Sequence, residues 1–195
     1  MRGIAEEGIE LRPLHAEDAE AFSNAFSAIG WSKPAATFAG YLEEQSQGLR
    51  WVRVVEVHGQ VAGYVTLRWA ASDPELRSWE VPEIMDLNVL PEFRRNGLGT
   101  ALLDAAEAEA ALRGPRVGLR MGLHSGYGAA QRLYVRRGYV PDGAGALSGA
   151  EVVAEGAAVR LDDELTLRMI KDLSDVRAEP MNRKGDGLQK LKGDG

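Results

Sequence analysis

A short run of basic residues and glycines carries the clearest chemical signal in this sequence. It reads Arg94-Arg95-Asn96-Gly97-Leu98-Gly99 and lies between an apolar segment at 84–90 and a helical pattern that begins near Leu98. Main-chain N–H groups at the start of a helix have no partner within the helix and attract anions. Glycines let an anion approach the backbone, and arginines add positive charge. The run therefore predicts a binding site for a pyrophosphate group.

Two common nucleotide-binding patterns do not fit this run. A Walker loop requires a lysine after its last glycine, whereas Thr100 follows Gly99 here. A dinucleotide fingerprint requires a third glycine, and that position is Leu102. An alternative without any ligand is a basic, glycine-rich turn that only caps a structural helix.

Together with its neighbours, the run resembles the acetyl-CoA site of the GNAT superfamily of N-acetyltransferases. The family pattern is Val-x-Pro-Glu-x-Arg, then Arg/Gln-x-x-Gly-x-Gly/Ala at the start of a helix, and Arg94, Gly97 and Gly99 fit its defined positions. A second segment, at 130–139, is similar to the family's Ala-x-x-Leu-Tyr-x-x-x-Gly-Phe. The resemblance extends over roughly residues 9–170, because the predicted order of elements also matches.

The resemblance implies that the backbone amides of residues 95–100 hold the pyrophosphate of acetyl-CoA. It also implies that the preceding strand binds the pantetheine arm and polarises the thioester carbonyl through its main chain. Many members have an asparagine seven residues before the family's tyrosine, where this chain has Tyr127, so that contact would be aromatic or through the main chain. The expected cofactor-binding residues are Leu87, Asn88, Val89, Arg94, Arg95, Asn96, Gly97, Leu98, Gly99, Thr100 and Tyr127.

For catalysis, the resemblance implies direct attack of a primary amine on the thioester in a ternary complex. Tyr134 occupies the position that usually protonates the departing thiolate. Glu83, eleven residues before Arg94, matches the glutamate base of the histone-acetylating branch. The alternatives for the base are Asp86, which period two would place on the opposite face of the strand from Glu83, and a chain of water molecules. Without the family pattern, Tyr134 would be a core tyrosine and Glu83 a solvated charge.

The elements that must position these residues follow from hydrophobic periodicity. The order indicates an α/β (α+β) domain, and the resemblance implies a mixed, mostly antiparallel sheet of six to seven strands, splayed between strands 4 and 5 and flanked by about four helices. We expect one domain at 1–172 and a polar tail at 173–195, either flexible or a remnant of cloning. The predicted strands lie at 9–14, 51–57, 61–69, 84–90, 117–123 and 165–170, and a further strand begins at 139–140. The predicted helices lie at 17–29, from after Pro34 to near Gly48, at 98–112 and at 128–137.

Composition narrows the range of functions. The chain has 195 residues, a net charge of −6 and no cysteine. The negative charge argues against nucleic-acid binding, and three scattered histidines without cysteine predict no metal site. No secretory signal or membrane-length apolar run is visible, so we expect a cytoplasmic protein without a membrane partner.

The expected acceptor is an amine of a small molecule or peptide, and a homodimer is the expected assembly because dimers are common in the family. A function of a different class is a non-catalytic sensor or regulatory module that binds acyl-CoA.

Overall fold

Eight strands form one mixed sheet in the computed structural model, which describes residues 8–178. The order across the sheet is β1-β2-β3-β4-β5-β8-β6-β7, and every neighbouring pair is antiparallel except β4 and β5. This confirms the predicted mixed, mostly antiparallel sheet, with the short β7 as an additional strand. The strands are β1 (Ile9–Pro13), β2 (Arg50–Val57), β3 (Gln60–Arg68), β4 (Glu83–Val89), β5 (Arg116–Gly122), β6 (Val140–Ser148), β7 (Glu151–Val152) and β8 (Leu165–Asp172).

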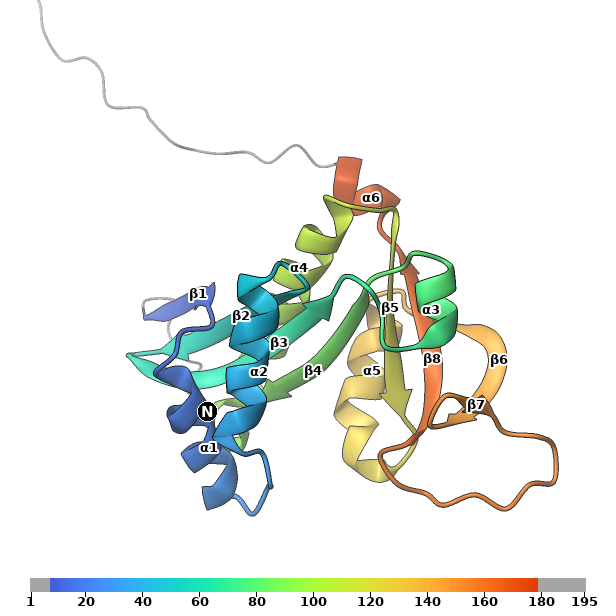
Figure 1. Cartoon of the computed structure of the whole chain (residues 1–195), viewed down its shortest axis with the longest axis horizontal. Coiled ribbons are helices and arrows are strands. Elements are labelled where there is room, and N and C mark those ends of the chain that lie inside the picture. Colours follow the sequence, from blue (N-terminus) through green and yellow to red (C-terminus); the bar gives the residue numbers. More distant parts are fainter. Residues whose placement is uncertain (1–7, 179–195) are drawn as a thin grey trace, which may run out of the picture.

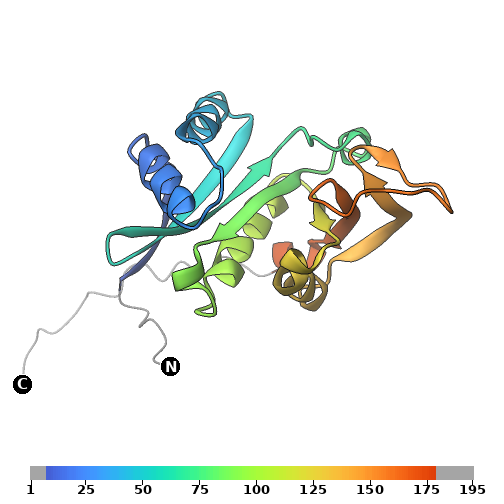
Figure 2. The ribbon, with the colours of Figure 1, turned by 90° about the horizontal axis from the view of Figure 1, so that it is seen from below.

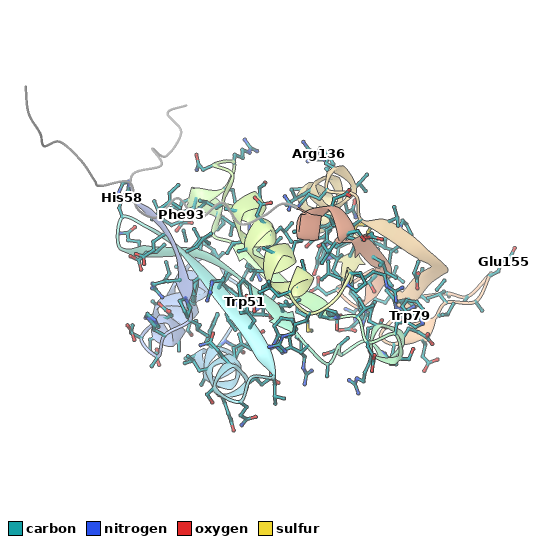
Figure 3. The ribbon with its side chains drawn as sticks, turned by 90° about the horizontal axis from the view of Figure 1, so that it is seen from above. Trp51, His58, Trp79, Phe93, Arg136 and Glu155 are labelled. Carbon is teal, nitrogen blue, oxygen red and sulfur yellow. The ribbon has the colours of Figure 1, made fainter. Side chains whose placement is uncertain are left out.

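Helices cover both faces of the sheet. Figure 2 shows α1 and α2 on one face, with α4 and α5 on the other. The turn between β2 and β3, marked by His58, and the loop after β7, marked by Glu155, lie at opposite ends of the molecule (Figure 3). The helices are α1 (Asp18–Ala28), α2 (Ala35–Ser46), α3 (Pro74–Ser78), α4 (Leu98–Ala111), α5 (Gly128–Arg136) and α6 (Ser174–Ala178), with single 3₁₀ turns η1 (Pro91–Phe93) and η2 (Ser125–Tyr127).

Two short helices, α3 and α6, were not predicted. The segment 70–82, predicted as a loop, contains α3 because Asp73 caps it. The Asp73 carboxylate accepts hydrogen bonds from the N–H groups of Glu75 and Leu76 at 2.9 and 3.1 Å, and Pro74 starts the helix. A Cβ placed on Gly118 of β5 would lie 2.5 Å from the Leu76 side chain, so this glycine lets α3 pack closely on the sheet.

The folded part continues beyond the expected domain boundary at residue 172. Leu173 is fully buried, and its N–H donates to the Pro115 carbonyl at 2.7 Å. Val176 of α6 packs against the same core as α4. The remainder of the predicted tail, 179–195, lies outside the described residues.

The larger hydrophobic core lies between the sheet and α4. Its helical side repeats every three to four residues, and its sheet side comes from the alternate positions of β3, β4 and β5. Burying this apolar stripe is the main source of the stability of the helix, because the hydrophobic effect scales with the area removed from water. The helix contributes Leu98, Leu102, Leu103, Ala106 and Ala110, and the strands contribute Val65, Leu67, Ile84, Val117 and Leu119.

The opposite face has an aromatic core under α1 and α2. Phe22, Phe26 and Phe38 are fully buried and surround Tyr64 of β3, with the Phe22 and Tyr64 ring centroids 5.1 Å apart in an edge-on arrangement. With Val52 and Val54 of β2, this cluster packs the two helices over β2 and β3.

Strands β4 and β5 part soon after they pair. Their register contains only Glu83–Gly118 and Ile84–Leu119, whereas β5 pairs with β8 from Arg116 to Gly122. In Figure 1 the two strands diverge below this point, and α5 is seen beside the gap, on the face of the sheet that also carries α4 (Figure 2). The predicted splay between strands 4 and 5 is therefore confirmed.

One buried carboxylate ties the elements around this splay together. Glu107 of α4, 2% exposed, accepts hydrogen bonds from Arg137 at the end of α5 at 2.7 and 2.9 Å and from Lys171 of β8 at 2.6 Å. Burial raises the pKa of Glu107, but the hydrogen bonds from Arg137 and Lys171 outweigh it and hold the pKa below its ordinary value of 4.5.

We predict that Glu107→Gln lowers the free energy of unfolding by about 2 to 3 kcal/mol, because it leaves the half-buried Lys171 without its carboxylate and Arg137 with the exposed Asp104 alone. The stabilisation by Glu107 is complete above pH 4.5, its ordinary pKa, and is lost as the pH falls toward the lowered value in the folded protein. Urea unfolding at several pH values measures both effects.

Asp104→Asn is the matched control. Asp104 binds the same Arg137 at 2.6 Å, but its side chain is 62% exposed, so the loss should stay below about 1 kcal/mol. Equal losses for the two variants would contradict a special role of the buried carboxylate.

Candidate functional site

The glycine-rich turn leaves a row of main-chain N–H groups without partners. Gly97 has φ +80°, which glycine adopts without strain, and α4 begins at the next residue. Within residues 8–178, the N–H groups of residues 95–100 donate no hydrogen bond, and the first bonded one is Ala101 to the Gly97 carbonyl at 3.0 Å. Gly97 and Thr100 are exposed. The turn therefore has the unpaired, outward-facing donors that an anion site needs.

Two side chains shape this turn. Asn96 donates from Nδ2 to the carbonyls of Phe93 and Arg94, both at 3.1 Å. Arg94 donates from Nε to the Val89 carbonyl at 2.8 Å, and its guanidinium lies 5.5 Å from the ring centroid of Trp31. These contacts hold the turn against the end of β4, and the Arg95 side chain beside them is exposed.

The main chain of β4 alternates between its neighbour β3 and the gap toward β5. The Leu90 N–H donates to Ala62 of β3 at 2.9 Å, and Asn88 lies opposite Tyr64. Because successive residues of an antiparallel strand point their N–H and C=O groups to alternate sides, Leu87 and Val89 direct theirs into the gap. Asn88 is instead tied to β3, since its Nδ2 also donates to the Tyr64 hydroxyl at 3.3 Å.

A β-bulge interrupts β4 where it begins to leave β5. Thr66 of β3 pairs with Met85 and Tyr64 pairs with Asn88, so two residues of β4 face only Val65. The bulged residue Asp86 has φ +48°, which is uncommon for a residue with a side chain.

The bulge reverses the expected direction of Asp86. Arg68 lies opposite Glu83 in the β3–β4 register and pairs with Glu44 of α2 at 3.4 Å, so Glu83 is on the α2 face. Asp86 contacts Tyr41 of the same helix. The expectation that the two carboxylates lie on opposite faces is wrong, because the extra residue shifts the alternation by one.

Glu83 is a buried carboxylate with main-chain partners. It is 2% exposed, and its Oε2 accepts hydrogen bonds from the N–H groups of Ser72 and Asp73 at 2.7 and 3.1 Å. Burial raises its pKa, against the lowering effect of these two hydrogen bonds. The contacts fix the turn before α3, and the raised pKa is a property that a general base requires.

Asp86 has side-chain partners and is more accessible. Its side chain is 33% exposed, and its Oδ1 lies 2.9 Å from the Lys33 ammonium. Its Oδ2 accepts a hydrogen bond from the Tyr41 hydroxyl. Neither partner could be found from sequence, because α2, the segment before it and β4 meet only in the fold.

Tyr134 of α5 lies inside the larger core. It is 8% exposed and packs edge-on against Tyr139, with ring centroids 5.7 Å apart. Burial, followed by the neighbouring phenol of Tyr127, raises its pKa above the ordinary value, so the hydroxyl stays protonated at neutral pH. A Cβ on Gly99 would lie 3.8 Å from Leu133 and 3.9 Å from Val89, so α5, the start of α4 and the end of β4 converge here.

Tyr127, in η2 between β5 and α5, lies on the β5 side of the gap. Its ring covers Gly122 of β5, where a Cβ would come within 2.5 Å, and the ring centroid lies 4.8 Å from that of His124. Burial, followed by the charge and hydrogen bonding of Asp163, raises its pKa, and the negative charge of Asp86 acts in the same direction.

Comparison with known proteins identifies the family to which this arrangement belongs. Residues 12–139 match the sequence profile of the Acetyltransferase (GNAT) family, which is more than half of the chain. The chain belongs to the GNAT acetyltransferases. No curated protein matches it in sequence.

Solved structures with the same fold include relatives with different acceptors. A putative acetyltransferase, yncA, from Salmonella typhimurium, solved with its cofactor acetyl-CoA, is 21% identical, with a TM-score of 0.62 over 87% of this chain and 96% of its own. A spermidine N-acetyltransferase SpeG chimera from Vibrio cholerae and hSSAT is 17% identical, with a TM-score of 0.62 over 89% and 100%. The Salmonella typhimurium acetyl transferase that modifies the N-terminal serine of ribosomal protein L7/L12 is 14% identical, with a TM-score of 0.62 over 86% and 96%.

No helix within residues 8–178 is long and apolar enough to cross a membrane. The same residues contain no group of three or more histidine, cysteine, aspartate or glutamate side chains placed to hold a metal ion.

The bulge that directs Asp86 depends on a close approach at Gly63. A Cβ at this position would lie 2.5 Å from the Asn88 carbonyl oxygen. We predict that Gly63→Ala lowers the free energy of unfolding by about 1 to 3 kcal/mol, because β4 has to move away from β3. Urea unfolding followed by circular dichroism measures the change.

Gly40→Ala is the matched control, since Gly40 lies inside α2 with open space around its Cβ position. There the same substitution should stabilise the protein by about 0.5 to 1 kcal/mol through helix propensity. A neutral or stabilising Gly63→Ala would mean that β3 and β4 do not approach as described.

Proposed function

We propose that this protein transfers the acetyl group of acetyl-CoA to a primary amine of a small molecule or peptide. The observation that carries the proposal is the row of unpaired N–H groups at residues 95–100, next to the point where β4 and β5 part. The family membership supports the same reaction. The cytoplasmic location and the homodimer stay predictions from the sequence.

The residues of the turn fit a pyrophosphate. Its donors are main-chain groups with open space at Gly97, where no atom lies within 4 Å of a Cβ position. The main-chain groups of Leu87 and Val89 line the gap and suit an extended arm with amide groups. When bound, acetyl-CoA supplies a thioester whose acetyl group an amine can take. A main-chain N–H directed into the gap would stabilise the negative charge that develops on the carbonyl oxygen.

Tyr134 is proposed to act on the thiolate that leaves. The amine nitrogen forms a bond to the carbonyl carbon, the carbon–sulfur bond breaks, and the sulfur needs a proton. A free thiol has a pKa of about 8.5. Because burial raises the pKa of Tyr134, its hydroxyl stays protonated and can donate a hydrogen bond to the departing thiolate, which then takes up the proton that the amine has released.

A carboxylate is proposed to meet the incoming amine, which must lose a proton before it attacks. Asp86 is the better supported of the two, because it is partly exposed and already contacts an ammonium group and a hydroxyl. Glu83 is the alternative base, supported by its raised pKa but separated from bulk water by burial.

A thiol-release assay with acetyl-CoA and a library of primary amines tests the proposal. Turnover with at least one amine is expected. Binding of acetyl-CoA by calorimetry without turnover on any amine, peptide or protein extract would favour the sensor or regulatory module instead.

We predict that Gly97→Glu weakens coenzyme A binding by about 100-fold or more, which corresponds to about 2.7 kcal/mol. The new side chain and its negative charge occupy the place expected for phosphate. Calorimetric titration measures the affinity.

Gly48→Glu is the control, because Gly48 also has a positive φ, +71°, and open space, but follows α2. The affinity of the Gly48→Glu variant for coenzyme A should equal that of the wild type. Unchanged affinity in Gly97→Glu would remove the turn from the binding site.

We predict that Tyr134→Phe lowers the turnover number by about 10²-fold, with less than about a twofold change in affinity for coenzyme A. Tyr139→Phe, which removes a hydroxyl from the adjacent buried ring, should have a turnover number close to that of the wild type. Pre-steady-state measurement of the chemical step separates the two. An unchanged chemical step in Tyr134→Phe would exclude this hydroxyl as a donor to the departing sulfur.

A further inference from the structure

The ammonium group of Lys33 occupies a small cage over the β4 bulge. Its Nζ lies 2.9 Å from Asp86 Oδ1 and 5.3 Å from the centroid of the Tyr64 ring. The second carboxylate oxygen of Asp86 accepts a hydrogen bond from the Tyr41 hydroxyl. A carboxylate on one side and an aromatic ring on another are the groups that recognise an alkylammonium ion.

The walls of the cage are fixed before any ligand arrives. Arg50 lies 4.6 Å from the Tyr41 ring centroid and donates to Thr66 Oγ1 at 2.7 Å, and Glu44 binds the same guanidinium. Tyr64 is fully buried in the aromatic core. The supporting contacts hold both tyrosine rings, so the cage does not depend on Lys33 for its shape.

Lys33 is the less constrained member of the cage. It belongs to the segment between α1 and α2, outside any helix or strand, and its side chain is 20% exposed. It reaches the cage by a flexible four-carbon stem, which can swing away without disturbing the backbone. The bulged Asp86, by contrast, is held in an unusual conformation by the pairing of β3 and β4.

The cage also borders the gap between β4 and β5. Asp86 follows the last paired residues of β4 by two positions, where the strand has begun to leave β5. An ammonium bound to Asp86 would therefore stand beside the place where the acetyl group is expected.

We propose that Asp86, Tyr41 and Tyr64 form the subsite for the ammonium group of the acceptor, and that Lys33 is a built-in competitor which the acceptor displaces. This inference rests on the proposed function. Because the occupant is a lysine side chain, the acceptor class that fits is an alkylammonium on a flexible chain, as in a diamine or a lysine side chain.

Calorimetric titration with 1,5-diaminopentane, without acetyl-CoA, tests the competition directly. If Lys33 fills the cage about 90% of the time, Lys33→Gln should bind the diamine about tenfold more tightly than the wild type. Lys33→Arg keeps a competing cation and should show a much smaller gain. Adding Asp86→Asn to Lys33→Gln should abolish the gain, with thermal unfolding as the check on folding.

Arg113→Gln controls for the general effect of removing one positive charge. Arg113 follows the end of α4, is exposed, and contacts Trp69 and no residue of the cage. Its diamine affinity should equal that of the wild type. An unchanged or weaker affinity in Lys33→Gln, an equal gain in Arg113→Gln, or a gain that survives Asp86→Asn would overturn the inference.

The same variants in the acetyl-transfer assay separate this inference from the proposed function. A lower KM for the diamine in Lys33→Gln at similar kcat supports both. Tighter diamine binding without any acetyl transfer would overturn the proposed function and leave the subsite standing. Acetyl transfer whose KM does not change in Lys33→Gln would overturn the subsite alone.

Discussion

Six consecutive main-chain N–H groups at the start of α4 must find their hydrogen-bond partners outside the helix. A helix cannot satisfy its own first donors, and here neither a side chain nor another loop among the described residues does so. The turn before α4 is shaped to keep them exposed, with Gly97 in the left-handed region and Asn96 and Arg94 bonded to carbonyls instead. These exposed donors are the feature on which the proposed binding of an anionic ligand depends.

The separation of β4 and β5 opens a gap next to this anion site, in which the rest of the cofactor could lie. Only two residue pairs join the strands, so beyond them one side of the β4 main chain faces a gap and not a neighbouring strand. The start of α4 and the middle of α5 converge on the same gap, the latter carrying the buried phenol of Tyr134. The network of Glu107 with Arg137 and Lys171 holds α4, α5 and β8 in this arrangement from the side of the core.

The bulge at Asp86 decides which face of the sheet carries the two carboxylates. One face packs against α4 and α5, the helices next to the proposed cofactor site. The other carries Glu83, Asp86 and the aromatic core of α1 and α2. Because the bulge adds one residue, both carboxylates lie on the second face, where an acceptor would approach. Buried Glu83 holds the turn before α3, whereas Asp86 already contacts an ammonium group.

What the sequence determined by itself is mostly local. The glycine-rich run, the start of α4 and the position of Tyr134 on α5 follow from residues close together in the chain, because caps, turns and helical faces depend on neighbours within a few positions. The family motifs extended this to the splay of the sheet. The short α3 was missed although Asp73-Pro74 is a recognisable start signal, because five residues give no hydrophobic period.

Only the tertiary structure decided where the carboxylates point and what they touch. A regular alternation would place Asp86 on the opposite face of β4 from Glu83. The pairing of β3 with β4, which Gly63 allows to be close, instead contains a bulge that no pattern within β4 reveals. The cage of Lys33, Tyr41, Tyr64 and Asp86 likewise joins a loop, a helix and two strands far apart in the chain. Contacts of this kind arise from packing between elements, and a single sequence contains no local signal for them.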